Sequence, residues 1–325
     1  MRSKMYTFHP KKTRPITGKQ QKGVAIITAL LIVTIAVTIS ISISTQLQLD
    51  VRRTGNLIAQ DQADFYLFAA EEWSQRILKQ DKKDSTIDAL SEDWAIALPP
   101  LPVAGGTIQG KLTDLHSCIN INSLVTGDAI NPTTQARLRQ LFKNLEVADL
   151  TPAIIDWIDT NQETTPDGAE DGYYLNLDNP YHTANTPLLS ITELRLVKGF
   201  EESETYRLIA PHLCAYVTEG KDALINVNTA SVEVLKSLSA EMNDNIAKNI
   251  IECRDNEPFK DLIEFNNCAK LETIIKDKAK LSTSSDYFLL RTQAIIGQAS
   301  KVMYSIIYRD DSGKTKIISR TQRTL

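Results

Sequence analysis

Recognisable catalytic motifs are missing from this sequence. It contains no HExxH zinc motif, no nucleophile elbow and no glycine-rich phosphate loop. The four histidines are scattered along the chain, at His9, His116, His182 and His212. These absences exclude the common hydrolase motifs, and we expect a protein that is not an enzyme.

An excess of positive charge is also missing. The formal net charge is −4 and the pI is about 5.7, which argues against nucleic-acid binding through bulk charge. With 325 residues and 42% hydrophobic content, the chain can bury a sizeable core and is expected to hold more than one compact unit.

Acidic residues are absent before Asp50, and residues 24–49 carry no charged side chain at all. As a helix, about 20 of these residues would cross a bilayer. Residues 1–23 carry seven Lys and Arg, which predicts that this end stays in the cytoplasm and that the rest of the chain is exported.

A cleavable secretory signal and a plain membrane anchor are two simple interpretations of this apolar run. A secretory signal usually has an apolar core of about 7–15 residues that ends at a small-x-small cleavage site. No such site stands out here, so this interpretation fits poorly. A single-pass anchor remains open.

Helix breakers are missing as well. No Pro or Gly occurs in residues 24–54, and Gly55 lies within a pattern that continues beyond it. Apolar residues recur at roughly helical spacing, at Leu57, Ala59, Ala63, Tyr66, Leu67, Ala70, Trp73 and Ile77. The pattern predicts one helix of about 55 residues that begins apolar all round and becomes one-sided. We expect it to span the membrane and then lay one face on a globular head.

The basic leader that ends in Lys22-Gly23 and leads directly into the apolar helix resembles the class III leader of type IV pilins and type II secretion pseudopilins. The resemblance implies that prepilin peptidase cuts after Gly23 and leaves Val24 as the mature N-terminus. It also implies a bacterial inner-membrane protein whose helix packs in a filament and whose C-terminal part lies in the periplasm.

Glutamate is missing from the fifth mature position, which is Thr28. In pilin-like subunits this glutamate offsets the terminal amine of a neighbour in a low-dielectric core, where an unpaired charge is costly. A subunit without it is similar to the K-type minor pseudopilin of type II secretion, which lies at the filament tip. The resemblance implies I-type and J-type minor pseudopilins and the major pseudopilin as partners, and allows contacts with secreted substrates.

Strand-like stretches are few. They occur at 107–120 and 286–320, with Arg309–Lys314 as a hairpin turn in the second stretch. The fold class is therefore α+β: a pilin-like long N-terminal helix and an antiparallel sheet, with a large inserted helical domain as in the K-type family. The predicted parts are the leader 1–23, the membrane helix 24–49, the amphipathic continuation and first strands 50–120, the insertion 121–280 and the last strands 281–325.

Two similar motifs occur within the insertion. "ININ" (119–122) and "INVN" (225–228) each end a strand-like stretch and are predicted to open a helix, because Asn, Ser and Thr suit helix N-caps. The segment 225–270 resembles a helix-hairpin-helix module of DNA-uptake proteins, and 191–200 resembles another such hairpin.

These modules use a glycine-rich hairpin to bring backbone amides to DNA phosphates. Here the second hairpin carries Glu241 and Asp244 instead. We therefore predict a scaffold or protein-interaction module. A membrane-tethered DNA-binding protein of a competence or type IV pilus system is the alternative.

Lys and Arg are absent from residues 144–194, whereas acids are dense there. The ten acids are Glu146, Asp149, Asp156, Asp159, Glu163, Asp167, Glu170, Asp171, Asp178 and Glu193. Close carboxylates raise one another's pKa unless a cation lies among them, and oxygen ligands in a turn-rich loop suit Ca²⁺. The loop 156–185 is therefore predicted to bind calcium.

The calcium loop does not follow the EF-hand pattern. With Asp159 first, Glu170 is twelfth, but the sixth position is Thr164 where glycine is required. The K-type family has a paired calcium site in a "GAEDxYY" region, which 168–174 matches. The resemblance implies one or two Ca²⁺ ions held by Asp159, Thr165 through its carbonyl, Glu170, Asp171, Asp178 and Asn185.

The acidic loop has two other interpretations. A solvated acidic loop is the simplest. A glycosidase-like carboxylate pair is disfavoured, because no aromatic-lined sugar cleft is suggested around it. A single-pass anchored periplasmic calcium protein is a further hypothesis for the whole chain, and it would differ from a pseudopilin in that its leader is not cut after Gly23.

No two of the four cysteines have CxxC spacing, which disfavours a zinc site. An even number in an exported chain suggests disulfides, with three possible pairings, although buried free thiols are an alternative. Cys253 and Cys268 are 15 residues apart and are the easiest pair. Cys118 and Cys214 would then bracket the first helical block.

Overall fold

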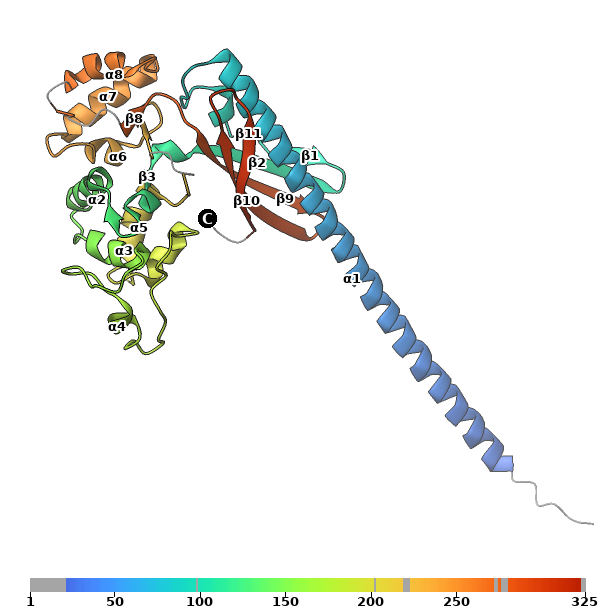
Figure 1. Ribbon diagram of the computed structural model, residues 1–325. Helices are drawn as coiled ribbons and strands as arrows, with labels where there is room; N and C mark the ends of the chain where they lie inside the picture. Colours follow the sequence, from blue (N-terminus) through green and yellow to red (C-terminus); the bar gives the residue numbers. More distant parts are fainter. Residues whose placement is uncertain are drawn as a thin grey trace, which may run out of the picture. The chain divides into compact units, whose positions relative to one another are not determined.

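The computed structural model describes residues 22–97, 99–201, 203–218, 223–271, 274–275 and 280–322. Most of the predicted leader, residues 1–21, lies outside the described residues. The chain divides into two units, Met1–Leu57 and Ile58–Leu325. Each unit is described by itself below (Figure 1).

The first unit is helical where it is described. Helix α1 runs from Lys22 to Asp84 without interruption, so the predicted long helix is confirmed and extends beyond Ile77. Of the helices that the structure describes, α1 is the only one long and apolar enough to cross a membrane. Hydroxyls along it, such as that of Thr34, donate to the carbonyl four residues earlier, which satisfies these polar groups inside the helix.

The second unit contains the predicted antiparallel sheet. Its strand order is β1-β2-β9-β10-β11, and every pairing is antiparallel. The strands are β1 (Leu101–Val103), β2 (Gly106–Asp114), β9 (Tyr287–Ile296), β10 (Ala299–Arg309) and β11 (Thr315–Thr321). The predicted hairpin turn joins β10 to β11, but Arg309 is the last residue of β10 rather than part of the loop.

From Ile58 onward, α1 packs along this sheet (Figure 1). Ala63, Leu67 and Leu78 are fully buried against strand residues. Their spacing follows the helical repeat, so one stripe of α1 forms the apolar contact. The alternation of buried and exposed residues along β9 puts one face of that strand toward the core.

Ion pairs reinforce this contact. Asp64 pairs with Lys301 at 2.6 Å, and Glu71 accepts from Arg320 at 2.7 Å and from the Ser305 hydroxyl at 2.7 Å. Both acids lie on the sheet-facing side of α1. Buried acids without such partners would oppose this packing.

The insertion between β2 and β9 has its own apolar core, which is made of residues from Ile119 to Leu281. Figure 1 shows its helices gathered beside the sheet rather than on it. They are α2 (Pro132–Asn144), α3 (Thr151–Ile158), α4 (Asp171–Tyr174), α5 (Ser203–Ile209), α6 (Val232–Lys236), α7 (Asp244–Asn256) and α8 (Leu262–Ala269), with 3₁₀ turns at Leu115–Ser117, Ile121–Ser123, Ile191–Leu196 and Ala210–His212. A further 3₁₀ turn, Asp93–Ala95, lies between α1 and β1.

The two repeated motifs form equivalent short parallel pairs. β3 (Ile119–Asn120) pairs with β6 (Leu213–Cys214), and β7 (Ile225–Asn226) pairs with β8 (Leu281–Ser282). A further short antiparallel pair is β4 (Val125–Thr126) with β5 (Ala129–Ile130).

The expectation that each motif opens a helix directly was wrong. Asn120 caps only a 3₁₀ turn, whereas α2 and α6 begin later and are capped by Asn131 and Ser231. The segment 191–200 is likewise no helical hairpin, because a 3₁₀ helix with a capping box occupies 191–196.

All four cysteines form disulfides, with the predicted pairing. Cys118 is bonded to Cys214 and Cys253 to Cys268. The first bond ties the beginning of the insertion to β6, and the second joins α7 to α8. In the chain-entropy model, a 15-residue loop such as the second stabilises the fold by about 3 kcal/mol.

Candidate metal centre

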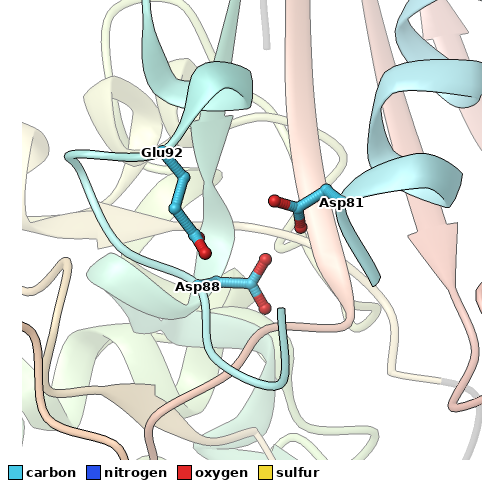
Figure 2. A group of neighbouring side chains, drawn as sticks. All are labelled: Asp81, Asp88 and Glu92. Carbon is cyan, nitrogen blue, oxygen red and sulfur yellow. The ribbon is translucent and has the colours of Figure 1, made fainter. Parts of the chain in front are cut away.

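Two groups of three carboxylates occur in the part of the chain that the structure describes. Asp81, Asp88 and Glu92 form the first group (Figure 2). Asp156, Asp159 and Glu170 form the second. In each group, one oxygen from every side chain lies within 4.8 Å of the others. Because like charges at this distance repel, each group needs compensation, and the two obtain it differently.

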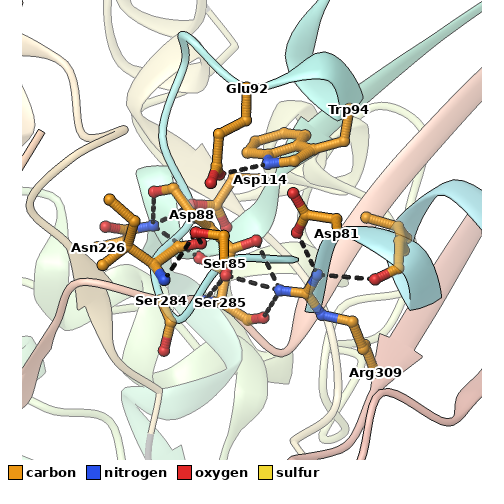
Figure 3. A network of polar contacts seen from close by, with 12 residues as sticks. Asp81, Ser85, Asp88, Glu92, Trp94, Asp114, Asn226, Ser284, Ser285 and Arg309 are labelled. Carbon is orange, nitrogen blue, oxygen red and sulfur yellow. Dashed lines mark hydrogen bonds and ion pairs between the residues drawn. The ribbon is translucent and has the colours of Figure 1, made fainter. Parts of the chain in front are cut away.

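The first group is compensated by an arginine of the chain itself. The Arg309 side chain is only 1% exposed, and its guanidinium donates to Asp81 at 2.7 Å and to both oxygens of Asp88 at 2.6 Å (Figure 3). Glu92 accepts from the Trp94 indole N–H at 3.0 Å and from the Ala89 amide at 2.8 Å. The positive charge that a metal ion would bring is thus already present.

This first group also anchors the insertion. The Asn226 amide donates to the Asp88 carbonyl at 2.9 Å, to the Asp114 carboxylate at 3.1 Å and to the Ser285 hydroxyl at 3.0 Å. Asp114 ends β2, and Ser285 lies two residues before the start of β9 (Figure 3). The network therefore lies where the chain leaves the sheet and where it returns.

Burial raises the pKa of Asp81 to about 7, and the neighbouring carboxylates of Glu92 and Asp88 add to this rise, whereas Arg309 lowers it. Burial likewise raises the pKa of Asp88, against the opposing effect of Arg309. Burial of these carboxylates therefore costs desolvation free energy, and the ion pairs with Arg309 offset part of this cost.

The second group lies in the predicted acidic loop. Asp156 belongs to α3, Asp159 caps the C-terminus of α3, and Glu170 immediately precedes α4. All three side chains are buried. The partial negative charge of a helix C-terminus disfavours a carboxylate at the position of Asp159, so the fold adds to the repulsion.

Asp156 is the best-satisfied member of this group. It accepts from the Thr165 hydroxyl at 2.7 Å and from the Thr165 amide at 3.1 Å. Gly168 packs so closely on Asp156 that an added Cβ would collide with the carboxylate. The glycine of the "GAED" stretch is therefore required for the close approach of this loop to α3.

Asp159 and Glu170 are poorly compensated. Burial, together with repulsion from Asp156 and Asp128, raises the pKa of Asp159 to about 6. Burial, together with repulsion from Asp156 and Asp159, raises the pKa of Glu170 to about 7. Lys198, the nearby base, donates to the backbone carbonyls of Asp167 and Gly168.

Several oxygens in this loop are buried with no hydrogen-bond partner among the described residues. They are Asp159 Oδ1, both carboxylate oxygens of Glu170 and Asn185 Oδ1. The backbone N–H of Asn185 donates to the Trp157 carbonyl at 3.0 Å, which ties Asn185 to α3. Unpaired buried acceptors from carboxylates and an amide are the donor set of a hard divalent cation, and Ca²⁺ fits it best because it accepts irregular oxygen coordination.

The six residues implied by the resemblance fall into different places. Asp159, Glu170 and Asn185 contribute the unpaired oxygens. Thr165 binds Asp156, and its carbonyl accepts from the Gly168 amide at 2.8 Å. The remaining residues do not join the group, because Asp171 binds His182 at 2.8 Å and the Thr183 amide at 2.9 Å, and Asp178 is exposed.

Sequence reasoning did not select Asp156. It lies three residues before Asp159, a spacing that puts two helical residues on one face. That spacing in "DWID" could have identified it.

The hairpin of the helix-hairpin-helix-like module carries no positive patch. It joins α6 to α7, and Lys236 at its start is bonded to Asp244 at 2.7 Å. This ion pair lowers the pKa of Asp244, so the positive charge of Lys236 is already paired with a carboxylate. This geometry does not favour a DNA-phosphate site.

Comparisons with known proteins agree on one family. Two family models, each described as "Type II secretion system (T2SS), protein K", match residues 117–218 and 225–284. A type II secretion system protein K from Aeromonas hydrophila is 35% identical over 93% of this chain and 97% of that protein. One from Pectobacterium carotovorum is 30% identical over 93% of this chain and 96% of that protein.

A solved structure supports the fold. It is described as the GspK-GspI-GspJ complex from the type 2 secretion system of enterotoxigenic Escherichia coli. One of its chains superposes with a TM-score of 0.73 at 25% identity, covering 84% of this chain and 100% of that chain.

Proposed function

The chain belongs to the type II secretion system protein K family, and from this premise we propose that it caps the tip of the periplasmic pseudopilus and helps to start its assembly. The observation that carries the proposal is the 35% identity to a protein K over nearly the whole of both chains. The related complex suggests I-type and J-type pseudopilins as its immediate partners.

The first turns of α1 support a tip position. The Thr28 hydroxyl bonds to the carbonyls of Val24 and Ala25, both at 3.1 Å. A hydroxyl is neutral, so Thr28 cannot offset the positive terminal amine of a neighbouring subunit. An internal subunit would need a negative charge at this position, because an unpaired charge is costly in an apolar bundle. The helical insertion adds bulk beside the sheet, which we propose prevents another subunit from stacking above.

The proposed mechanism is non-enzymatic. The apolar part of α1 partitions into the inner membrane as a single span until it is drawn into a bundle with the helices of the other minor pseudopilins. The periplasmic part then remains at the filament end. Because only the first subunits lack a neighbour above, the protein acts at initiation rather than in elongation.

A deletion strain tests the function. Cells that lack the protein should fail to release the exported proteins of the system, and re-expression of the intact chain should restore release. N-terminal sequencing should find a chain that begins at Val24 only when prepilin peptidase is present. Normal secretion without the protein, or a full-length chain in both strains, would exclude this role.

We also propose that the second carboxylate group binds calcium. Asp156, Asp159, Glu170 and Asn185 would hold the ion, which would supply the positive charge missing from this loop. These residues come from α3, from the turn before α4 and from the segment after His182. The ion would hold these three segments together and would thereby order the outer part of the insertion.

Calorimetric titration with CaCl₂ and MgCl₂ after chelator treatment tests the calcium proposal. Glu170→Gln should abolish calcium binding, because it removes a ligand charge from the buried group. Glu163→Gln is the matched control, since Glu163 is an exposed acid of the same loop. Equal binding by both variants, or none by the unchanged protein, would contradict the proposal.

A further inference from the structure

A groove follows one flank of α1 in the second unit. Tyr66, Ala70, Trp73 and Ile77 line it, and Asp81 continues the row. Steps of three and four residues place these side chains on one helical face. This flank differs from the stripe of Ala63, Leu67 and Leu78 that is fully buried on the sheet. Tyr66 and Ile77 pack on the edge of the sheet clusters and stay partly exposed, and Trp73 is exposed.

The first half of the groove is apolar. It is a hollow of about 230 Å³ between α1 and strands β1 and β2, with the buried Trp94 among its lining residues. Trp73 is 43% exposed, Ile96 57% and Leu101 37%. Large apolar side chains gathered around one concavity are typical of an interaction site rather than of ordinary surface.

The second half is acidic. It is a hollow of about 640 Å³ that shares Ile77, Asp93, Trp94 and Ile96 with the first half, so the two halves form one continuous groove. Asp81, Asp84, Glu92 and Asp93 line it, and no Lys, Arg or His is among its described lining residues. It also lies at the C-terminus of α1, where the helix dipole adds negative potential. The last turn of α1 carries Lys82 and Lys83 as well, but neither is among the described residues that line the hollow.

The buried Arg309 does not cancel this charge. It pairs with Asp81 and Asp88, whereas Asp84 and Asp93 lie outside these ion pairs and are exposed. Figure 2 shows the carboxylates of Asp81 and Glu92 on opposite sides of the space beside Asp88. The carboxylate of Asp84 accepts from the neutral side-chain amide of Gln80, at 2.8 Å.

We propose that this groove binds a segment of a partner protein that carries a bulky apolar side chain and, on the order of 12 Å away, a Lys or Arg. This spacing is the length of α1 from Trp73 to Asp81, which is eight positions further along the helix. The apolar side chain occupies the hollow beside Trp73, and the cation meets the carboxylates at the end of α1.

Charge decides between this occupant and others. An anionic membrane surface or a nucleic acid is repelled by the acidic half. A bare metal ion finds Asp81 and Glu92 already bonded to Arg309, Trp94 and Ala89. A Lys or Arg side chain fits both halves, because its stem is apolar and its head remains hydrated at the groove rim.

The test uses the full chain in detergent micelles and three labelled helical peptides. The first has one Phe and one Lys about two helical turns apart. The second replaces the Lys by Glu, and the third replaces the Phe by Ser. Fluorescence anisotropy should show the Lys peptide binding at least about tenfold more tightly than the Glu peptide, with the difference shrinking at high salt.

Variants locate the binding. Asp84→Asn combined with Asp93→Asn should weaken the Lys peptide about fivefold or more and leave the Glu peptide unweakened. Trp73→Ala should weaken the Phe-containing peptides and not the Ser peptide. Glu72→Gln is the matched control, because Glu72 is an exposed acid on the flank of α1 near Arg320, and it should change nothing.

Three results would overturn the proposal: no binding of the Lys peptide at millimolar concentration, equal binding of the Lys and Glu peptides, or equal effects of the control and the double variant. The measurement needs no other secretion protein. Its failure therefore leaves the proposed tip role intact, and a failed secretion test leaves the groove intact.

Discussion

The two carboxylate groups have the same composition, two aspartates and a glutamate within 4.8 Å, yet they are maintained in opposite ways. In the first, two of the three carboxylates are paired with Arg309 from a distant strand. Among the described residues no Lys or Arg forms an ion pair with the carboxylates of the second, which keeps several oxygens unpaired. A buried acid group with its own arginine is a fixed part of the fold, whereas we propose that the group without one takes its counter-charge from a cation in solution.

The largest expected effect comes from breaking the first group. Arg309→Met leaves Asp81 and Asp88 buried without their counter-charge. Removing one partner of a buried ion pair costs about 3–5 kcal/mol of unfolding free energy. Urea unfolding followed by circular dichroism would measure this loss, and added calcium should not restore it.

Two further variants sharpen this result. Arg291→Gln changes an exposed arginine of β9 and should alter stability by less than about 0.5 kcal/mol. Adding Asp81→Asn and Asp88→Asn to Arg309→Met should recover part of the loss, because the uncompensated charges are then gone. A cost below about 1 kcal/mol for Arg309→Met would show that the arginine is not needed to hold this group.

The second group should instead respond to chelation. At a calcium concentration 100 times Kd, binding stabilises the folded state by about 2.7 kcal/mol, so a chelator should lower Tm by roughly 5–10 °C. Differential scanning calorimetry with and without chelator measures this shift. Glu170→Gln should show no shift, and Arg309→Met should still show it.

The first group was much less visible in the sequence than the second. The dense acids and the "GAED" stretch pointed to the loop for which we propose calcium binding, because its proposed ligands lie within 30 residues of one another. Arg309 is separated from Asp81 by 228 residues and from Asp88 by 221. In the sequence it belongs to a turn-like "RDDSGK" run, and only the tertiary fold brings it to the end of α1.

Periodicity explains which elements of the fold were predictable. The long helix and the strands of the final hairpin have enough residues to show a repeat. The three-residue β1 and the two-residue strands are too short to show one. The expected helix starts after Asn120 and Asn226 were wrong. Each of these side chains accepts from a backbone amide of the local turn and donates to the carbonyl of a residue far away in the sequence, Tyr216 or Asp88.

A smaller effect is expected from pH. The pKa of Asp159 is raised to about 6 and that of Glu170 to about 7, and both must lose their protons to bind calcium. Calcium affinity should therefore fall about tenfold per pH unit, or more, as pH decreases from 7 to 5.5. Calorimetric titration across this range measures it, and a flat profile would contradict the assignment of these ligands.

Without calcium, the stability of the protein should change with pH in the opposite direction. Because both pKa values are raised above their unfolded values near 4, the stability that these groups contribute is complete below pH 4. It is lost as pH rises through 6 and 7. In chelator, Tm should thus fall between pH 5 and pH 8 from this contribution, and saturating calcium should remove the fall.

The smallest effect concerns a carboxylate at the edge of the second group. Asp128 is exposed, and its pKa is lowered mainly by a bond from the Thr160 hydroxyl, at 2.7 Å. Its charge acts on Asp159 through space. Asp128→Asn should weaken calcium binding by only about two- to threefold, because solvent screens an exposed charge. Titration at low and high salt tests this, since the difference should vanish at high salt. A loss as large as that of Glu170→Gln would make Asp128 a direct ligand and would extend the site toward β5.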